Sequence, residues 1–112
     1  MAKARTVGQS IEREEYENEV RLVDRSSGPA IEKELPSGDK VVEIRIVVAR
    51  DNRDGYDTLD VALWRPSLRK RALTLKNDEG IEVVGALRRR FWKTGKVVAS
   101  RWQVEGRELT RV

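Results

Sequence analysis

Cysteine and histidine are both missing from this 112-residue sequence, and each absence excludes a class of chemistry. Without cysteine there is no disulfide, no thiolate nucleophile and no zinc site built on sulfur. Without histidine, the commonest general base and the commonest metal ligand are absent as well. Three carboxylates stand close together in the segment 51–57, DNRDGYD, which lacks the alternating ligands and the distal Glu of a calcium loop. We therefore expect a polar hairpin loop there, and neither an enzyme nor a metal or cofactor site.

Long apolar runs are also missing. No stretch approaches the roughly 20 residues of a membrane span, and the opening MAKARTVGQS has no apolar stretch of the kind found in secretory signals. We expect a cytoplasmic protein without membrane contact. Residues 1–17 include the acidic EREEYE stretch and too few apolar positions to pack, so they are predicted to be a flexible N-terminal extension. Residues 18–112 form the predicted domain.

Basic charge is concentrated in the second half of the chain. Residues 61–112 carry thirteen basic and five acidic side chains, whereas residues 18–60 carry seven basic and ten acidic ones. Between Val83 and Val104 there is no acidic residue at all, and six cations stand there. A stretch of one sign is typical of a surface that binds a polyanion, although an ordinary solvated face is the alternative.

Alternating apolar residues and turn signals predict short strands with a single helix. The helix is expected at 67–76, because Leu68, Ala72 and Leu75 recur at helical spacing after Pro66, with Ser67 as its N-cap. Gly85 marks a bulge or a barrel corner. The fold predicted from this order is all-β with a small helix: a five-stranded OB-fold Greek-key barrel with the short helix between strands 3 and 4. The strand segments are 20–23, 31–35, 41–50, 57–64, 81–92 and 97–106.

The segment GALRRRFWKTGK, residues 85–96, sets arginines beside aromatic residues. Because a strand sends alternate residues to opposite faces, Arg88, Arg90 and Trp92 share one side. Phe91 belongs to the other side and is expected to be buried at the barrel end, with Arg89 reaching out beside it. Arginine binds phosphate and stacks on bases, and exposed tryptophans stack on unpaired bases, so this mixture suits single-stranded nucleic acid.

Two further tryptophans are candidates for the same surface. Trp64 ends the third strand on the parity opposite to Leu59, Val61 and Leu63, which predicts that it points outward. Trp102 is expected to be a half-buried packing residue of the last strand and is included among the candidate binding residues. The candidate nucleic-acid-binding residues are Trp64, Arg88, Arg90, Trp92, Lys93, Lys96, Arg50, Arg53 and Trp102.

The chain from about residue 18 to 109 resembles the bacterial single-stranded DNA-binding protein family. NEVRLVDR is similar to the family's first strand, with Asp24 in place of a glycine, and GIEVVGALRRRFW is similar to its fourth strand, the most specific match. The resemblance implies that Trp92 and Trp64 stack on bases and that Arg88 and Arg90 face the DNA. Two other aromatics of the family are not present, at Thr58 and in the Arg50–Arg53 region, where arginines offer phosphate contacts instead.

The resemblance implies binding of single-stranded DNA with little sequence preference, an accessory role in DNA replication, recombination or repair, and assembly into a dimer or tetramer at the nucleoid. The sequence ends at GRELTRV without the acidic tail through which family members recruit enzymes, so a short member without that role is expected. Two alternatives stay open. One is an OB-fold protein-interaction module with weak DNA affinity, and the other is an RNA-binding protein, because stacking and phosphate contacts do not distinguish the sugars.

Overall fold

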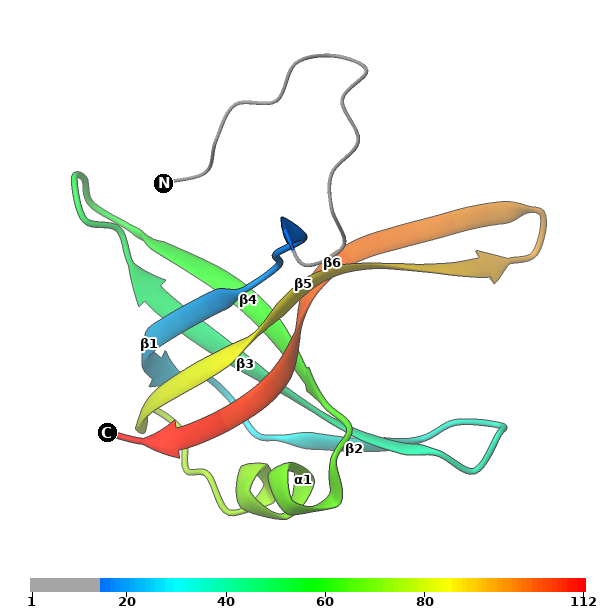
Figure 1. Ribbon diagram of the computed structural model, residues 1–112, viewed down its shortest axis with the longest axis horizontal. Helices are drawn as coiled ribbons and strands as arrows, with labels where there is room; N and C mark the ends of the chain where they lie inside the picture. Colours follow the sequence, from blue (N-terminus) through cyan, green and yellow to red (C-terminus); the bar gives the residue numbers. More distant parts are fainter. Residues whose placement is uncertain (1–14) are drawn as a thin grey trace.

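The computed structural model describes residues 15–112 and contains six strands and one helix (Figure 1). The predicted extension, residues 1–17, lies almost entirely outside the described residues. No helix among residues 15–112 is long and apolar enough to cross a membrane. In chain order the elements are β1 (Val20–Ser26), β2 (Ile31–Glu34), β3 (Lys40–Ala49), β4 (Tyr56–Leu63), α1 (Pro66–Leu73), β5 (Gly80–Thr94) and β6 (Val97–Arg111).

The strands close into a barrel in the order β1-β5-β6-β4-β3-β2, and an additional pairing of β1 with β3 completes the ring. Both β1 and β2 run antiparallel to β3, β1 against its C-terminal half and β2 against its N-terminal half, so together they occupy the place of one strand. The pairing between β4 and β6 is parallel, with Val61 opposite Val104. The predicted five-stranded barrel with a helix between its third and fourth strands is therefore confirmed.

The barrel interior is filled by β-branched and leucine side chains. Val42, Ile44 and Ile46 of β3 lie on one face of the strand, point inward and are buried. Leu68 and Ala72 of α1 join the same buried cluster, so the helix closes one end of the barrel (Figure 1). The other core side chains are Val61, Leu63, Ile81, Val83, Val104 and Leu109.

Several element boundaries differ from those predicted, most clearly those of α1 and β6. Helix α1 begins at Pro66, and its N-cap is Arg65 rather than Ser67. Proline fits the first helical position because its ring presets φ and its missing N–H has no partner there anyway, which moves the helix start forward. The helix also ends at Leu73 instead of residue 76, and β6 continues to Arg111 instead of residue 106 because it keeps pairing with β5 up to Ile81.

Gly85 lies at a bulge, as predicted. The β5–β6 register shifts between Val84 and Gly85, where Arg107 becomes the extra residue of β6. A Cβ atom at Gly85 would lie 2.1 Å from the carbonyl oxygen of Glu105, so only glycine permits this close approach of the two backbones.

Beyond the bulge, β5 and β6 form a hairpin that leaves the barrel. Within the described chain, β5 pairs with β1 only up to Gly85, and from residue 87 to its end it pairs with β6 alone. We call residues 87–102 the arm; it is the orange and ochre hairpin that projects from the barrel in Figure 1. The β2–β3 hairpin projects on the same side of the barrel, and this placement defines the candidate site.

Candidate nucleic-acid interface

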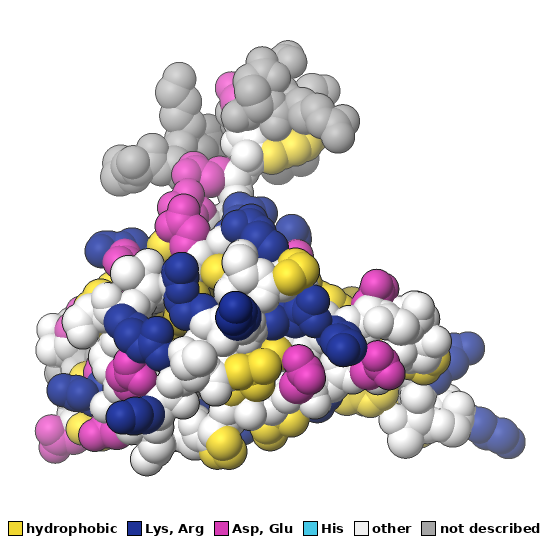
Figure 2. All heavy atoms as spheres, turned by 90° about the horizontal axis from the view of Figure 1, so that it is seen from below, with side chains coloured by type: hydrophobic (Ala, Val, Ile, Leu, Met, Phe, Trp, Pro, Cys, Tyr) yellow, Lys and Arg dark blue, Asp and Glu magenta, His cyan; other side chains and the backbone are white. Residues whose placement is uncertain are grey.

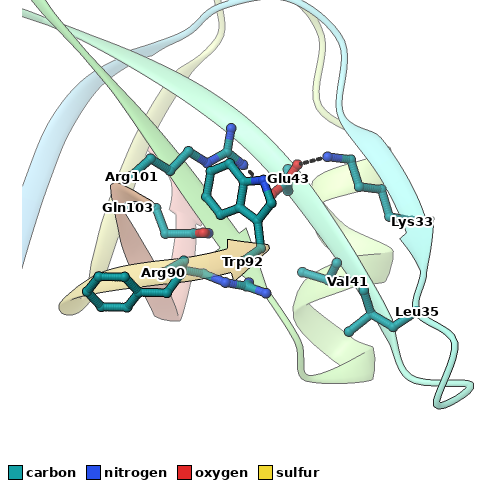
Figure 3. Close-up of a pocket in the computed structure, with 9 residues that line it drawn as sticks. Lys33, Leu35, Val41, Glu43, Arg90, Trp92, Arg101 and Gln103 are labelled. Atoms are coloured by element: carbon teal, nitrogen blue, oxygen red, sulfur yellow. Dashed lines mark hydrogen bonds and ion pairs between the residues drawn. The ribbon is translucent and has the colours of Figure 1, made fainter. Parts of the chain in front are cut away.

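A groove lies between the arm and the β2–β3 hairpin (Figure 3). Lys33 of β2 and Glu43 of β3 line it on one side, and Arg90, Trp92 and Arg101 line it from the arm. The indole of Trp92 is 46% exposed, so a planar ligand can reach it. The groove therefore combines cations from two hairpins with an accessible aromatic face.

The register of the arm brings the groove residues together. Arg88 lies opposite Gln103, Arg90 opposite Arg101 and Trp92 opposite Ala99. Directly opposed residues of an antiparallel pair project from the same face. The predicted alternation of Arg88, Arg90 and Trp92 is thus confirmed, and the partner strand adds Arg101 to that face. We call it the inner face of the arm.

A second part of the groove extends across the barrel toward β4. Trp64, Arg88 and Glu105 line it together with Arg90 and Gln103, which also line the first part. Trp64 is partly buried, and the Arg90 guanidinium carbon lies 5.3 Å from the centroid of its ring. The two parts share Arg90 and Gln103, so the tryptophans Trp64 and Trp92 lie along one continuous surface.

Carboxylates in the groove hold several of its cations in ion pairs. Glu43 pairs with Lys33 Nζ at 2.6 Å and with Arg101 Nη2 at 2.9 Å, and Arg88 Nε donates to Glu105 Oε2 at 2.8 Å. Burial raises the pKa of Glu43, but the hydrogen bond and charge of Lys33, together with the charges of Arg101 and Arg90, outweigh it and lower that pKa below its ordinary value of 4.5. Glu43 is therefore ionised at neutral pH.

Basic and acidic side chains are mixed on one face of the molecule (Figure 2). On the face shown in Figure 2, lysines and arginines are interspersed with acidic and apolar side chains. The described residues also contain no group of three or more acidic side chains placed to hold a metal ion.

The opposite, outer face of the arm carries a second aromatic group. The Arg89 guanidinium carbon lies 5.2 Å from the ring centroid of Phe91 and 5.5 Å from that of Trp102. Phe91, which also borders the groove, is 63% exposed and Trp102 is 58% exposed. Burial of Phe91 at the barrel end and half-burial of Trp102 were both wrong expectations, because the arm continues past the barrel and nothing among the described residues covers its outer face.

The remaining candidate residues lie away from the groove lining. Lys93 is the last residue but one of β5 and Lys96 lies in the turn that follows, so both stand at the tip of the arm. Arg50 and Arg53 lie in the β3–β4 loop, on a different projection of the barrel (Figure 1), where Arg50 Nε pairs with Asp57 Oδ1 at 3.0 Å.

Sequence reasoning missed several groove residues: Lys33, Glu43, Arg101, Gln103 and Glu105. The three β6 residues among them carry a usable signal, because a two-residue turn at Gly95-Lys96 fixes which β6 residue faces each β5 residue. No comparable signal identifies Lys33 and Glu43, because they reach the arm only through closure of the barrel.

Closed topology, a capping helix and a groove beside the arm define an OB-fold protein. No protein-family model matches the sequence, and neither does any curated protein. Among solved structures, the chain is similar to the SSB of Plasmodium falciparum in its complex with ssDNA, with a TM-score of 0.66 and 18% sequence identity. The match covers 87% of this chain and 96% of that chain. Similarity at this level of identity establishes the fold.

Proposed function

We propose that this protein binds single-stranded DNA with little sequence preference in the groove between the arm and the β2–β3 hairpin. The observation that carries the proposal is the inner face of the arm, where Arg88, Arg90 and Arg101 accompany Trp92. The similar solved structure is that of an SSB in complex with ssDNA, which supports the same ligand.

Each component of a single strand has a matching group in the groove. Unpaired bases expose π-faces that stack on Trp92 and Trp64, each worth about 1–3 kcal/mol. Arg88, Arg90 and Arg101 attract phosphates, and Lys93 and Lys96 extend the positive charge to the tip of the arm. Phosphates compete with Glu43 and Glu105 for these cations, so the affinity gained per contact is smaller than for unpaired cations.

Tryptophan fluorescence titrated with oligo-dT at two salt concentrations tests the proposal, with duplex DNA as the control. We expect strong quenching by dT that weakens at high salt, and little quenching by the duplex because its bases are already stacked. Replacing Arg88 and Arg90 together by alanine should abolish most of the quenching at moderate salt. Replacing Lys70 and Arg107, exposed cations that line neither part of the groove, removes the same charge and should leave binding nearly unchanged. Absence of quenching by dT at low salt would refute the proposal.

The outer face of the arm favours a second candidate, a protein-interaction module. Phe91, Val98 and Trp102 are exposed on the arm, and apolar groups exposed together are typical of docking surfaces. This candidate predicts that the Arg88 and Arg90 double variant changes nothing, because there is little DNA binding to lose.

RNA is the alternative ligand for the same groove. Competition between dT and U oligomers of equal length separates the two, and a preference for U would identify a group that recognises the 2′-hydroxyl.

We further propose a homo-oligomer, a dimer or tetramer, that acts in DNA replication, recombination or repair in the cytoplasm at the nucleoid. Sedimentation velocity across a concentration series tests the assembly, and a monomer at all concentrations would contradict it.

A further inference from the structure

Gln103 carries a buried side-chain amide that makes no hydrogen bond to any described residue. The residue is 3% exposed, and neither its Nε2 nor its Oε1 has a hydrogen-bond partner among the described residues. Within residues 15–112, Arg69 Nε is the one other buried side-chain polar atom in this state. A buried amide without partners is unfavourable, because it has lost its bonds to water without replacing them.

The amide is placed where the two parts of the groove meet. Gln103 lines both parts, between the Trp92 side and the Trp64 side. Figure 3 shows its side chain reaching from β6 toward Trp92. Of the cations nearby, Arg101 pairs with Glu43 and Arg88 with Glu105, and the Arg90 guanidinium lies over the Trp64 ring. Among the described residues that line the groove, Gln103 is the one whose buried side-chain polar atoms have no hydrogen-bond partner.

An amide offers a donor and an acceptor side by side. The Watson–Crick edge of each of the four bases also has a donor next to an acceptor: N6–H and N1 in adenine, N4–H and N3 in cytosine, N1–H and O6 in guanine, N3–H and O4 in thymine. In a duplex these groups are occupied by the opposite strand, so only an unpaired base can present them.

We propose that Gln103 hydrogen-bonds the Watson–Crick edge of a base that stacks on Trp92 or Trp64, and so recognises that the base is unpaired without recognising which base it is. This inference rests on the proposed single-strand binding and adds to it a polar contact with the base edge. This contact explains why the buried position is occupied by a glutamine. An apolar side chain there would exclude water equally well and would leave no hydrogen bond unmade.

Two measurements test the role of Gln103. The first compares wild type with Gln103→Met, which keeps the length of the side chain and removes its hydrogen bonding. Binding of dT, followed by anisotropy of a labelled oligomer, should weaken about 3–10-fold. The Tm of the free variant should rise by roughly 4–8 °C, because a buried unsatisfied amide is removed. A Tm that falls would show that the amide has a structural partner and would overturn the inference.

The second measurement needs no variant. An oligomer of difluorotoluene nucleotides has the shape and stacking surface of dT but lacks the hydrogen-bonding edge. Wild type should bind it about 3–10-fold more weakly than dT, and Gln103→Met should bind the two oligomers equally. Equal binding of both oligomers by wild type, or equal binding of dT by wild type and variant, overturns the inference and leaves the proposed function intact. Binding of neither oligomer by wild type overturns both.

Discussion

Adjacent residues of the arm have different surroundings. Arg90 lies over Trp64 on the inner face, whereas Arg89 lies between Phe91 and Trp102 on the outer face. One position along the strand thus separates a cation of the groove from a cation of the opposite surface. Predictions for single residues depend on this alternation.

Replacing Trp92 by alanine should weaken dT binding about 5–100-fold, because one stacking contact is lost. Replacing Trp102 by alanine removes the same side chain from the outer face and should change the affinity less than about twofold. Anisotropy of a labelled oligomer measures both variants without depending on tryptophan emission. An equal loss in the two variants would show that the strand also contacts the outer face.

Replacing Glu43 by glutamine should strengthen dT binding at low salt, because Lys33 and Arg101 lose a competing carboxylate. We expect an increase of about 3–10-fold in affinity at pH 7, a size that corresponds to one charge near the ligand. The matched control is Glu108→Gln, an exposed acid of β6 that lines neither part of the groove. Unchanged affinity for Glu43→Gln would show that these two cations do not contact the strand.

The same substitution should alter the acid sensitivity of the fold. The pKa of Glu43 is lower in the folded protein than its ordinary value of 4.5, so its ionised form stabilises the fold above about that pH. This stabilisation is lost as the pH falls through the lowered pKa. Urea unfolding at pH 7 and at successively lower pH should therefore show a smaller acid loss for Glu43→Gln than for wild type. Parallel curves would contradict the assignment.

At the scale of elements, the bulge at Gly85 connects the barrel to the arm. On its N-terminal side β5 belongs to the barrel wall, and on its C-terminal side it pairs with β6 alone. The β5–β6 register changes at this point, so the bulge decides which residues of the arm face the groove.

Replacing Gly85 by alanine should destabilise the protein by about 3 kcal/mol, because the added Cβ would meet the Glu105 carbonyl oxygen and the backbones must separate. Gly38→Ala is the control: its φ is +92° but nothing lies within 4 Å, so it should cost about 1–2 kcal/mol from backbone strain alone. Urea denaturation of both variants gives the comparison. A smaller loss at Gly85 than at Gly38 would contradict the close approach.

Most elements could be predicted from local sequence, and their ends could not. β3 and β4 were identified from β-branched residues and parity, and the turn at Gly95 from its composition. The start of α1 was misassigned because Ser67 is a good cap in isolation, while Pro66 already occupies the first turn. The end of β6 was missed because its last residues are held by pairing with the start of β5, which local sequence does not contain.

At the scale of the whole molecule, the charge of the arm should govern the salt dependence of binding. Each phosphate contact on a single strand contributes about −0.7 to the slope of log K against log salt. Contacts through Arg88, Arg90, Arg101 and the two lysines at the tip predict a slope of about −2 to −4. The Arg88 and Arg90 double alanine variant should make the slope shallower by about 1.4. The slope is measured from about 50 to 300 mM salt. If the double variant leaves it unchanged, the phosphates do not contact Arg88 and Arg90.

Residue types and their alternation, which the sequence contains, determined three things: the strand-rich barrel, the shared side of Arg88, Arg90 and Trp92, and the absence of cysteine and histidine chemistry. Only the tertiary structure decided that Lys33 and Glu43 reach the arm and that Phe91 and Trp102 stay exposed. It also decided that the side-chain amide of Gln103 is buried without a hydrogen-bond partner among residues 15–112. The physical reason is that parity is a local property of the backbone, whereas burial and ion pairing depend on which distant strands the closed barrel brings together and on how far the arm extends past it.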